Sequence, residues 1–258
     1  LCLVFVPRRV WIPLFGLLVA SGSIRTYAPI NLFNSPSTGV AEGEIRVMTY
    51  NTRGFGLTDS GRAEMTRYMI ASGAQIIAFQ EGMGSLEHNK QLVARLKYTQ
   101  IPHYKCYNAG SESLGVISTY RVTDAQLISR SGGNIIVAFW LKVPDEKPWI
   151  VVNCHLRSNA LTYDERGKFS QWTKTGENPD SGAWKRRLYD KITLAAAHAE
   201  MVDTLARFVN EHRDQVKFIC GDFNDTPISY TRQRVARMGL TDAFREAGHG
   251  FGFSFRRS

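Results

Sequence analysis

The sequence Phe-Ile-Cys-Gly-Asp-Phe-Asn-Asp-Thr-Pro, residues 218–227, passes directly from an apolar run into a cluster of polar side chains. A short apolar run bounded by turn residues is typical of a buried strand. Gly221 permits a close approach of the backbone to a neighbouring chain. Asp222 and Asn224, if the chain is extended there, point to the same side. Turns rich in Asp and Asn are common, so this stretch alone does not define a site.

Three other apolar runs end in the same way, with a polar residue that can bind metal or phosphate. They are 45–51, ending at Asn51; 76–81, ending at Gln80-Glu81; and 150–155, ending at Asn153-Cys154-His155. In layered α/β folds, ligands bind at the carboxyl ends of strands. Carboxylates and amides gathered there suit Mg²⁺, which takes one or two protein carboxylates. Taken singly, Glu81, His155 and Asn51 would each have an ordinary structural explanation.

Strand-like and helix-like patterns interleave from Ile45 onward, which predicts an α/β or layered α+β fold. The predicted strands cover 45–50, 75–80, 115–119, 135–143, 149–155, 217–220 and 251–255. The predicted helices cover 59–72, capped by Asp59 or Ser60, and 87–98, 183–212 and 232–238.

The composition is that of an ordinary globular protein. The 258 residues are 43% hydrophobic and 21% charged, which excludes disordered, collagen-like and low-complexity chains. The four cysteines lack the C-x-x-C spacing of a zinc site, and Cys154 and Cys220 are expected to be buried core residues. The net charge of +9 suits a polyanionic partner, and it equally suits plain solubility.

The first 25 residues differ from the rest of the chain. Arg8 and Arg9 precede an apolar stretch, Val10–Ala20, that as a helix is shorter than the roughly 30 Å hydrocarbon layer. A signal peptide is one interpretation. Because the apolar residues 1–6 precede the two arginines, Arg8 and Arg9 are better explained as a loop between two membrane spans, of which the first is truncated. A cytoplasmic position of this loop would place the rest of the chain outside the cytoplasm. We expect a membrane-anchor segment at 1–25, a linker at 26–43 and one domain at 44–258.

The order of the polar strand ends resembles the endonuclease/exonuclease/phosphatase superfamily, which has the deoxyribonuclease I-like fold. Residues 153–158, N-C-H-L-R-S, are similar to the family's N-T-H-L-x-S, and residues 221–227, G-D-F-N-D-T-P, are similar to its most specific motif. The resemblance runs from Ile45 to Phe255 and implies a four-layer α/β/β/α sandwich with truncated C-terminal strands. Membrane spans ahead of such a domain are similar to a bacterial, Bacteroidetes-type subgroup.

The resemblance implies Mg²⁺-dependent hydrolysis of phosphodiester bonds, with Mn²⁺ as an alternative metal. Glu81 would bind the metal with Asn51 beside it, and Asp222 would orient or deprotonate the attacking water. His155 and Asn224 would donate hydrogen bonds to the phosphoryl oxygens, so that catalysis involves His155, Asp222 and Asn224. The implied metal ligands are Glu81, Asn51 and Asp222, and the implied substrate contacts are Asn51, Asn153 and Arg157.

The chain departs from the family pattern in two places. The family's R-x-D strand and Ser-Asp-His motif do not follow the strand at 251–255, and His249 is expected in a loop. We therefore expect the chain as given to be weakly active or inactive. Residues 114–122 resemble a shortened G-x-A-I-x-S-x-Y-P-I segment with Arg121 in place of proline, which argues against a catalytic role for Tyr120.

The favoured interpretation is a monomeric nuclease tethered to a bacterial inner membrane, with its catalytic domain on the outer side. Lys185-Arg186-Arg187, Lys191 and Arg157 could guide a polyanion toward His155, although a solvated helix face explains them equally well. A phospholipid or phosphoinositide head group is the alternative substrate, because a membrane anchor would bring it within reach. A non-catalytic binding module on the same fold is the third hypothesis.

Overall fold

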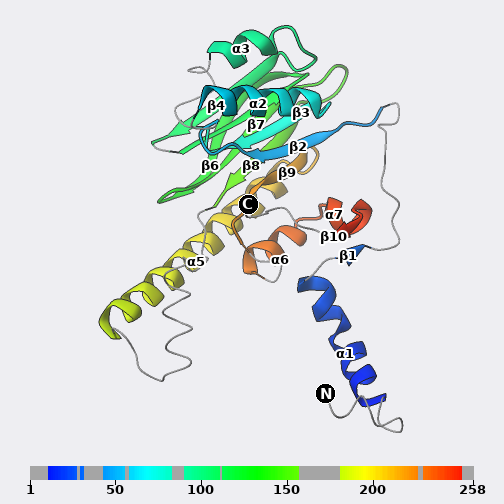
Figure 1. The fold of residues 1–258 in the computed structure, drawn as a ribbon, viewed down its shortest axis with the longest axis vertical. Coiled ribbons are helices and arrows are strands. Elements are labelled where there is room, and N and C mark those ends of the chain that lie inside the picture. The colour runs from blue at the N-terminus through cyan, green and yellow to red at the C-terminus, as the bar shows by residue number, and fades with distance from the viewer. Residues whose placement is uncertain are drawn as a thin grey trace. The chain divides into compact units, whose positions relative to one another are not determined.

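The computed structural model describes residues 11–27, 30–31, 43–55, 58–82, 90–110, 112–156, 181–225 and 229–251 (Figure 1). The chain divides into two compact units. One comprises residues 40–225, and the other combines residues 1–39 with 226–258. The larger unit contains nearly all of the predicted site residues.

The larger unit is built on two four-stranded mixed sheets. The first sheet has the order β2-β3-β5-β4, formed by β2 (Val47–Asn51), β3 (Ile76–Gln80), β5 (Glu112–Ser118) and β4 (His103–Ala109). The second has the order β6-β7-β8-β9, formed by β6 (Arg121–Ser131), β7 (Asn134–Lys142), β8 (Trp149–His155) and β9 (Val216–Asp222). Each sheet contains one parallel pair, β2 with β3 and β8 with β9, and its other pairs are antiparallel.

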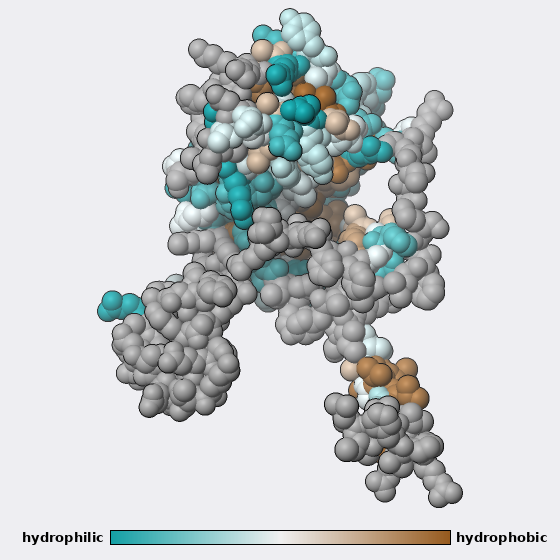
Figure 2. All heavy atoms as spheres, viewed as in Figure 1, coloured by the Kyte–Doolittle hydropathy of each residue, from teal (hydrophilic) through white to brown (hydrophobic). Residues whose placement is uncertain are grey.

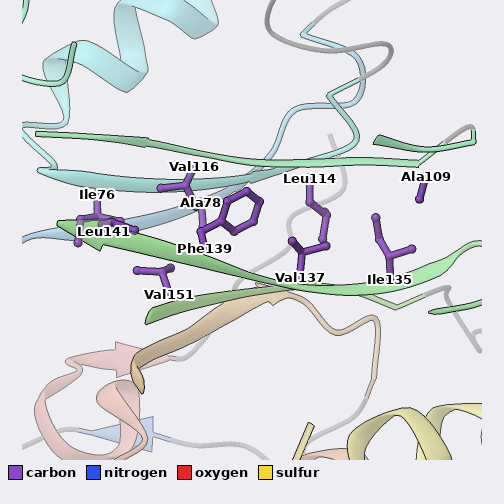
Figure 3. Close-up of a cluster of buried hydrophobic side chains, with 10 residues drawn as sticks. All are labelled: Ile76, Ala78, Ala109, Leu114, Val116, Ile135, Val137, Phe139, Leu141 and Val151. Atoms are coloured by element: carbon purple, nitrogen blue, oxygen red, sulfur yellow. The ribbon is translucent and has the colours of Figure 1, made fainter. Parts of the chain in front are cut away.

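The two sheets pack face to face over a buried apolar layer (Figure 3). Side chains of alternate residues on β3 and β5 meet those of β7 and β8 there, and the layer includes Ile76, Ala78, Leu114, Val116, Val137, Phe139 and Val151. Alternation of this kind is what places one face of each strand in a common core.

Helices cover the outer faces of both sheets. Met69 of α2 (Asp59–Ala71) and Leu92 and Leu96 of α3 (Lys90–Leu96) join a second buried cluster on the first sheet. On the other side, Phe208 of α5 (Ser181–Glu211) makes an edge-on ring contact with Trp140 of β7. The predicted four-layer α/β/β/α sandwich is therefore confirmed.

Four elements were not predicted, and two of them are the edge strands β4 and β6. Neither contains an uninterrupted apolar run, and most of their residues are only partly buried or exposed. The others are the short helix α7 (Ala243–Ala247) and the two-residue strand β1 (Ile30–Asn31), which lies within the predicted linker. The cap of α2 also differs from the prediction, since the hydroxyl of Thr58, and not Asp59 or Ser60, accepts from the backbone N–H of Gly61.

The smaller unit contains α1 (Trp11–Tyr27), a two-stranded sheet of β1 (Ile30–Asn31) and β10 (Gly250–Phe251), α6 (Tyr230–Ala236) and α7. His249 lies in a loop, as predicted, and residues 252–258 of the predicted last strand are outside the described residues. The apolar side chains of α1, drawn in brown in Figure 2, are exposed, with Leu14 at 59% and Leu18 at 69%. Among the helices described, none combines the length and apolar character needed to span a membrane.

At Gly221 the backbone of β9 lies very close to that of β8. The φ of Gly221 is 135°, and a Cβ there would lie 2.0 Å from the carbonyl oxygen of Cys154. The prediction that this glycine permits a close backbone approach is confirmed.

Replacing Gly221 by alanine should therefore lower the free energy of unfolding by about 3 kcal/mol or more, as strain and overpacking act together. Gly132→Ala is the matched control, because Gly132 also has a positive φ, 57°, but has nothing within 4 Å of the added carbon. We expect it to cost roughly 1 kcal/mol. Urea unfolding followed by circular dichroism measures both, and equal losses would contradict the close approach.

Candidate active site

One buried amide joins the two sheets behind the site. Asn153 of β8 is fully buried. Its Nδ2 donates to the carbonyl oxygens of Phe79 and Gly115 in the first sheet, at 2.9 and 3.0 Å. Its Oδ1 accepts from Nε2 of Gln80 at 2.7 Å. The described hydrogen bonds of Asn153 therefore all run between the sheets, and its predicted contact with substrate stays a prediction.

A second amide joins the polar ends of three strands. Nδ2 of Asn51 donates to Oε1 of Glu81 at 2.7 Å and to Oδ2 of Asp222 at 3.1 Å. Oδ1 of Asn51 accepts from the backbone N–H of Arg53 at 3.1 Å. Asn51 ends β2, Glu81 follows β3 and Asp222 ends β9, so the structure brings together the three predicted metal ligands.

The backbone of Glu81 is in the left-handed region, with a φ of 54°. This conformation is uncommon for residues other than glycine, asparagine and aspartate, and strain of this kind is concentrated at functional sites. The backbone N–H of Gly54 donates to the carbonyl oxygen of Glu81 at 2.7 Å, and the hydroxyl of Thr52 donates to the same oxygen at 3.2 Å. The loop after β2 thus fixes the residue that carries the central carboxylate.

The imidazole of His155 lies between two carboxylates. Its Nδ1 is 3.0 Å from Oε2 of Glu112, and its Nε2 is 3.4 Å from Oε1 of Glu81. The ring is almost buried, with its side chain 9% exposed. Because each ring nitrogen faces a carboxylate, the orientation of the ring is fixed and its Nε2 edge faces Glu81, one of the two carboxylates that Asn51 joins.

Glu112 is a site residue that sequence reasoning missed. It is the first residue of β5, whereas the predicted strand began only at Gly115. An acidic residue just before an apolar run was the only available signal, and it is indistinguishable from a solvated acid at a strand end. What makes Glu112 part of the site is its pairing across the sheets with His155.

Asn224 lies beyond the end of β9 and not on an extended strand with Asp222. Its φ of 46° is left-handed, a conformation that asparagine tolerates. Its backbone N–H donates to Oδ1 of Asp222 at 3.0 Å, and its Nδ2 donates to the carbonyl oxygen of Leu156 at 2.7 Å. The side chain therefore closes a turn against the end of β8, and its predicted contact with the phosphoryl group stays a prediction.

The other predicted residues lie elsewhere or are not described. Arg157 is outside the described residues, and in the basic cluster of the long helix only the side chain of Arg186 is described, which is exposed. Tyr120 packs its ring against Trp149, at the end of β8 opposite His155. The expectation that Tyr120 has no catalytic role stays a prediction.

The two cysteines beside the site differ in burial. Cys154 is buried, and burial raises the pKa of its thiol well above the usual range. Cys220 is partly buried against the core between the sheets, and desolvation raises the pKa of its thiol to about 12. Both thiols are therefore neutral at physiological pH. The prediction of a buried core residue is confirmed for Cys154 and in part for Cys220.

The donor set fits a hard divalent cation. Over the part of the chain that the structure describes, no group of three or more His, Cys, Asp or Glu side chains has the arrangement of a metal site. Magnesium needs only one or two protein carboxylates and completes its shell with water and phosphate oxygens. Glu81 and Asp222 converge on one amide, and Glu81 is 37% exposed, which leaves its carboxylate accessible from solvent.

Comparison with known proteins identifies the family. Residues 48–258 match the model of the endonuclease/exonuclease/phosphatase family. The chain belongs to this family. An endonuclease/exonuclease/phosphatase domain is a phosphoesterase, so the protein is a phosphoester hydrolase. A search of curated proteins finds no significant match.

Solved structures show more distant similarity. A truncated TDP2 from Caenorhabditis elegans is 14% identical with a TM-score of 0.47, over 74% of this chain and 67% of that one. The 3′ phosphatase NExo from Neisseria, bound to a product DNA hairpin, is 16% identical with a TM-score of 0.48, over 79% and 74%. Membership of the endonuclease/exonuclease/phosphatase family rests on the family model and not on these values.

Replacing Asn153 by alanine should lower the free energy of unfolding by about 3–5 kcal/mol, because Gln80 and two backbone carbonyls lose their buried partner together. Asn108→Ala on the exposed side of β4 should change it by less than about 0.5 kcal/mol. Urea midpoints measure both variants. A midpoint for Asn153→Ala close to that of the unmodified chain would show that the amide does not join the sheets.

Proposed function

We propose that this phosphoesterase is a Mg²⁺-dependent phosphodiesterase that cleaves nucleic acid. The observation that carries the proposal is the junction at Asn51, whose single amide nitrogen bonds the carboxylates of Glu81 and Asp222 beside His155. Two acids, an amide and an imidazole, gathered from the strand ends of both sheets, are the groups that metal-assisted hydrolysis of a phosphate ester requires.

Each side chain has a defined task in this mechanism. Glu81 and Asp222 would hold the metal. The amide of Asn51 would join them if it turned so that its oxygen, and not its nitrogen, faced the metal. When bound, Mg²⁺ or Mn²⁺ supplies positive charge that neutralises the phosphate oxygens. Asp222 orients the attacking water and accepts its proton. His155 donates to a phosphoryl oxygen as negative charge increases there, and Glu112 holds its ring in position.

Nucleic acid is the favoured substrate because the chain carries 32 basic and 23 acidic side chains and is therefore suited to a polyanion. A phospholipid or phosphoinositide head group is the second candidate. The exposed apolar surface of α1 favours it, because attachment to a membrane would place head groups close to the enzyme.

Glu81→Gln and Asp222→Asn should each reduce turnover at least 10³-fold on supercoiled plasmid DNA with Mg²⁺, since each removes a carboxylate that the reaction uses. Glu200→Gln, an exposed residue of α5, is the matched control and should retain full activity. EDTA should abolish turnover of the unmodified enzyme. Cleavage of phospholipid vesicles in place of plasmid would select the second substrate, and EDTA-resistant cleavage would contradict the proposal.

We also propose that α1 attaches the enzyme to a membrane, as in the membrane-anchored bacterial subgroup. The side chains of α1 described here include no acidic residue, and Trp11, Leu14, Phe15 and Leu18 are all more than half exposed. Apolar side chains so exposed to water are stabilised at a lipid interface. The proposed location is the bacterial inner membrane with the catalytic unit, a monomer, on the outer side. Protease treatment of intact spheroplasts and light scattering of the purified chain test these two points.

Flotation with anionic lipid vesicles tests the attachment directly. The full chain should float with the vesicles, and Leu14→Asp with Leu18→Asp should reduce the floating fraction at least 10-fold, because two charges are costly in the apolar layer. Tyr98→Asp is the matched control, since Tyr98 is 91% exposed outside α1. Flotation that survives the double substitution would rule out α1 as the anchor.

A further inference from the structure

One row of paired residues crosses the second sheet at the level of the active site. Arg130 of β6 pairs with Ile135 of β7, Ile135 with His155 of β8, and His155 with Asp222 of β9. Directly paired residues project from the same face of a sheet. Arg130 therefore projects from the face that carries His155 and Asp222, toward the first sheet.

The guanidinium of Arg130 lies over a neighbouring turn at the rim of the site. Its Nη2 is 3.1 Å from the position that a Cβ on Gly110 would occupy, in the turn that precedes β5. Glu112, the carboxylate partner of His155, begins β5, and its Oε1 is 3.5 Å from the corresponding position at Gly133. The turn that follows Arg130 thus lies against the residue that orients His155.

Arg130 has no structural task that the described residues reveal. Its side chain is exposed, and within the described ranges its guanidinium has no hydrogen-bond or ion-pair partner. Glu112 accepts from the histidine rather than from this arginine. An always-charged group beside a phosphoesterase site is therefore available to a ligand.

The hairpin that carries Arg130 is held firmly at its base. Nδ2 of Asn134 donates to the carbonyl oxygen of Ser131 at 2.7 Å, and Oδ1 of Asn134 is 3.1 Å from Nε2 of His198 on α5. His198 is buried, and this burial lowers the pKa of its imidazole. The turn between β6 and β7 is thus fixed to the helix layer, which holds the backbone of Arg130 in place.

We propose that Arg130 binds a second phosphate of a polynucleotide, away from the scissile one, and thereby makes the site select phosphate polymers over single phosphate esters. This inference rests on the proposed function. Neighbouring strands are about 4.8 Å apart, so the backbones of Arg130 and His155 are roughly 10 Å apart. A nucleic-acid strand carries a phosphate about every 3.4 Å along its axis. A strand lying along the row presents further phosphates to Arg130, whose guanidinium bonds phosphate in a bidentate manner.

The test compares a polymer with a single ester on the full chain with Mg²⁺. For a single-stranded DNA oligonucleotide, Arg130→Gln should raise KM about 10-fold with little change in kcat, because the contact exists in ground state and transition state alike. The slope of the logarithm of affinity against the logarithm of salt concentration should become shallower by about 0.7, because one phosphate contact is lost. Hydrolysis of bis(p-nitrophenyl) phosphate should be unchanged. Arg121→Gln, at the opposite end of β6 and paired with Lys142, is the matched control and should change neither substrate.

Binding of the labelled oligonucleotide in EDTA, followed by fluorescence anisotropy, gives a readout that does not depend on turnover. Arg130→Gln should weaken this binding about 10-fold, and Arg130→Lys should restore part of it. Unchanged KM, affinity and salt slope would overturn the inference, as would equal losses on both substrates. If the unmodified chain cleaves neither substrate, the kinetic comparison reports on the proposed function and not on Arg130, and the anisotropy comparison alone decides the role of Arg130.

Discussion

The buried amide of Asn153 is the interaction on which the site depends. This side chain fixes the position of β8 against β3 and β5, across a largely apolar layer, through three hydrogen bonds. A slip of one residue turns every side chain of a strand to its other face. The same register places His155 and Glu81, which follow within two residues of Asn153 and Gln80, in contact with each other. The packing of the sheets and the geometry of the candidate site therefore depend on one set of hydrogen bonds.

The interior strands were predictable because each contains an apolar run bounded by polar residues. β3, β5, β7 and β8 all begin and end within three residues of their predicted limits, and so does the edge strand β9, which is also an apolar run. The edge strands β4 and β6 were not predictable, because their residues alternate between partial burial and solvent and form no apolar run. Pairing across the sheet, which a single sequence does not display, is what makes them strands.

The site was predictable in part for the same reason. Asn51, Glu81, His155 and Asp222 stand directly at the ends of apolar runs, and parallel pairing brings such ends to one edge. Asn153 has the same sequence signature but is buried two residues before the end of β8, so the pattern alone did not show whether it joins the sheets or binds a ligand. Glu112 enters from the start of an antiparallel strand, which a search restricted to the carboxyl ends of strands does not detect.

The hydrogen bond between Asn51 and Asp222 joins positions 171 residues apart in the chain. During synthesis, the first sheet emerges from the ribosome long before β9 does, and domains fold progressively from the N-terminus. A nascent chain that stops before β9 has Glu81 and His155 but no Asp222, and so lacks part of the candidate site. The topology therefore delays the assembly of the complete candidate site until β9, the last strand of the second sheet, has docked.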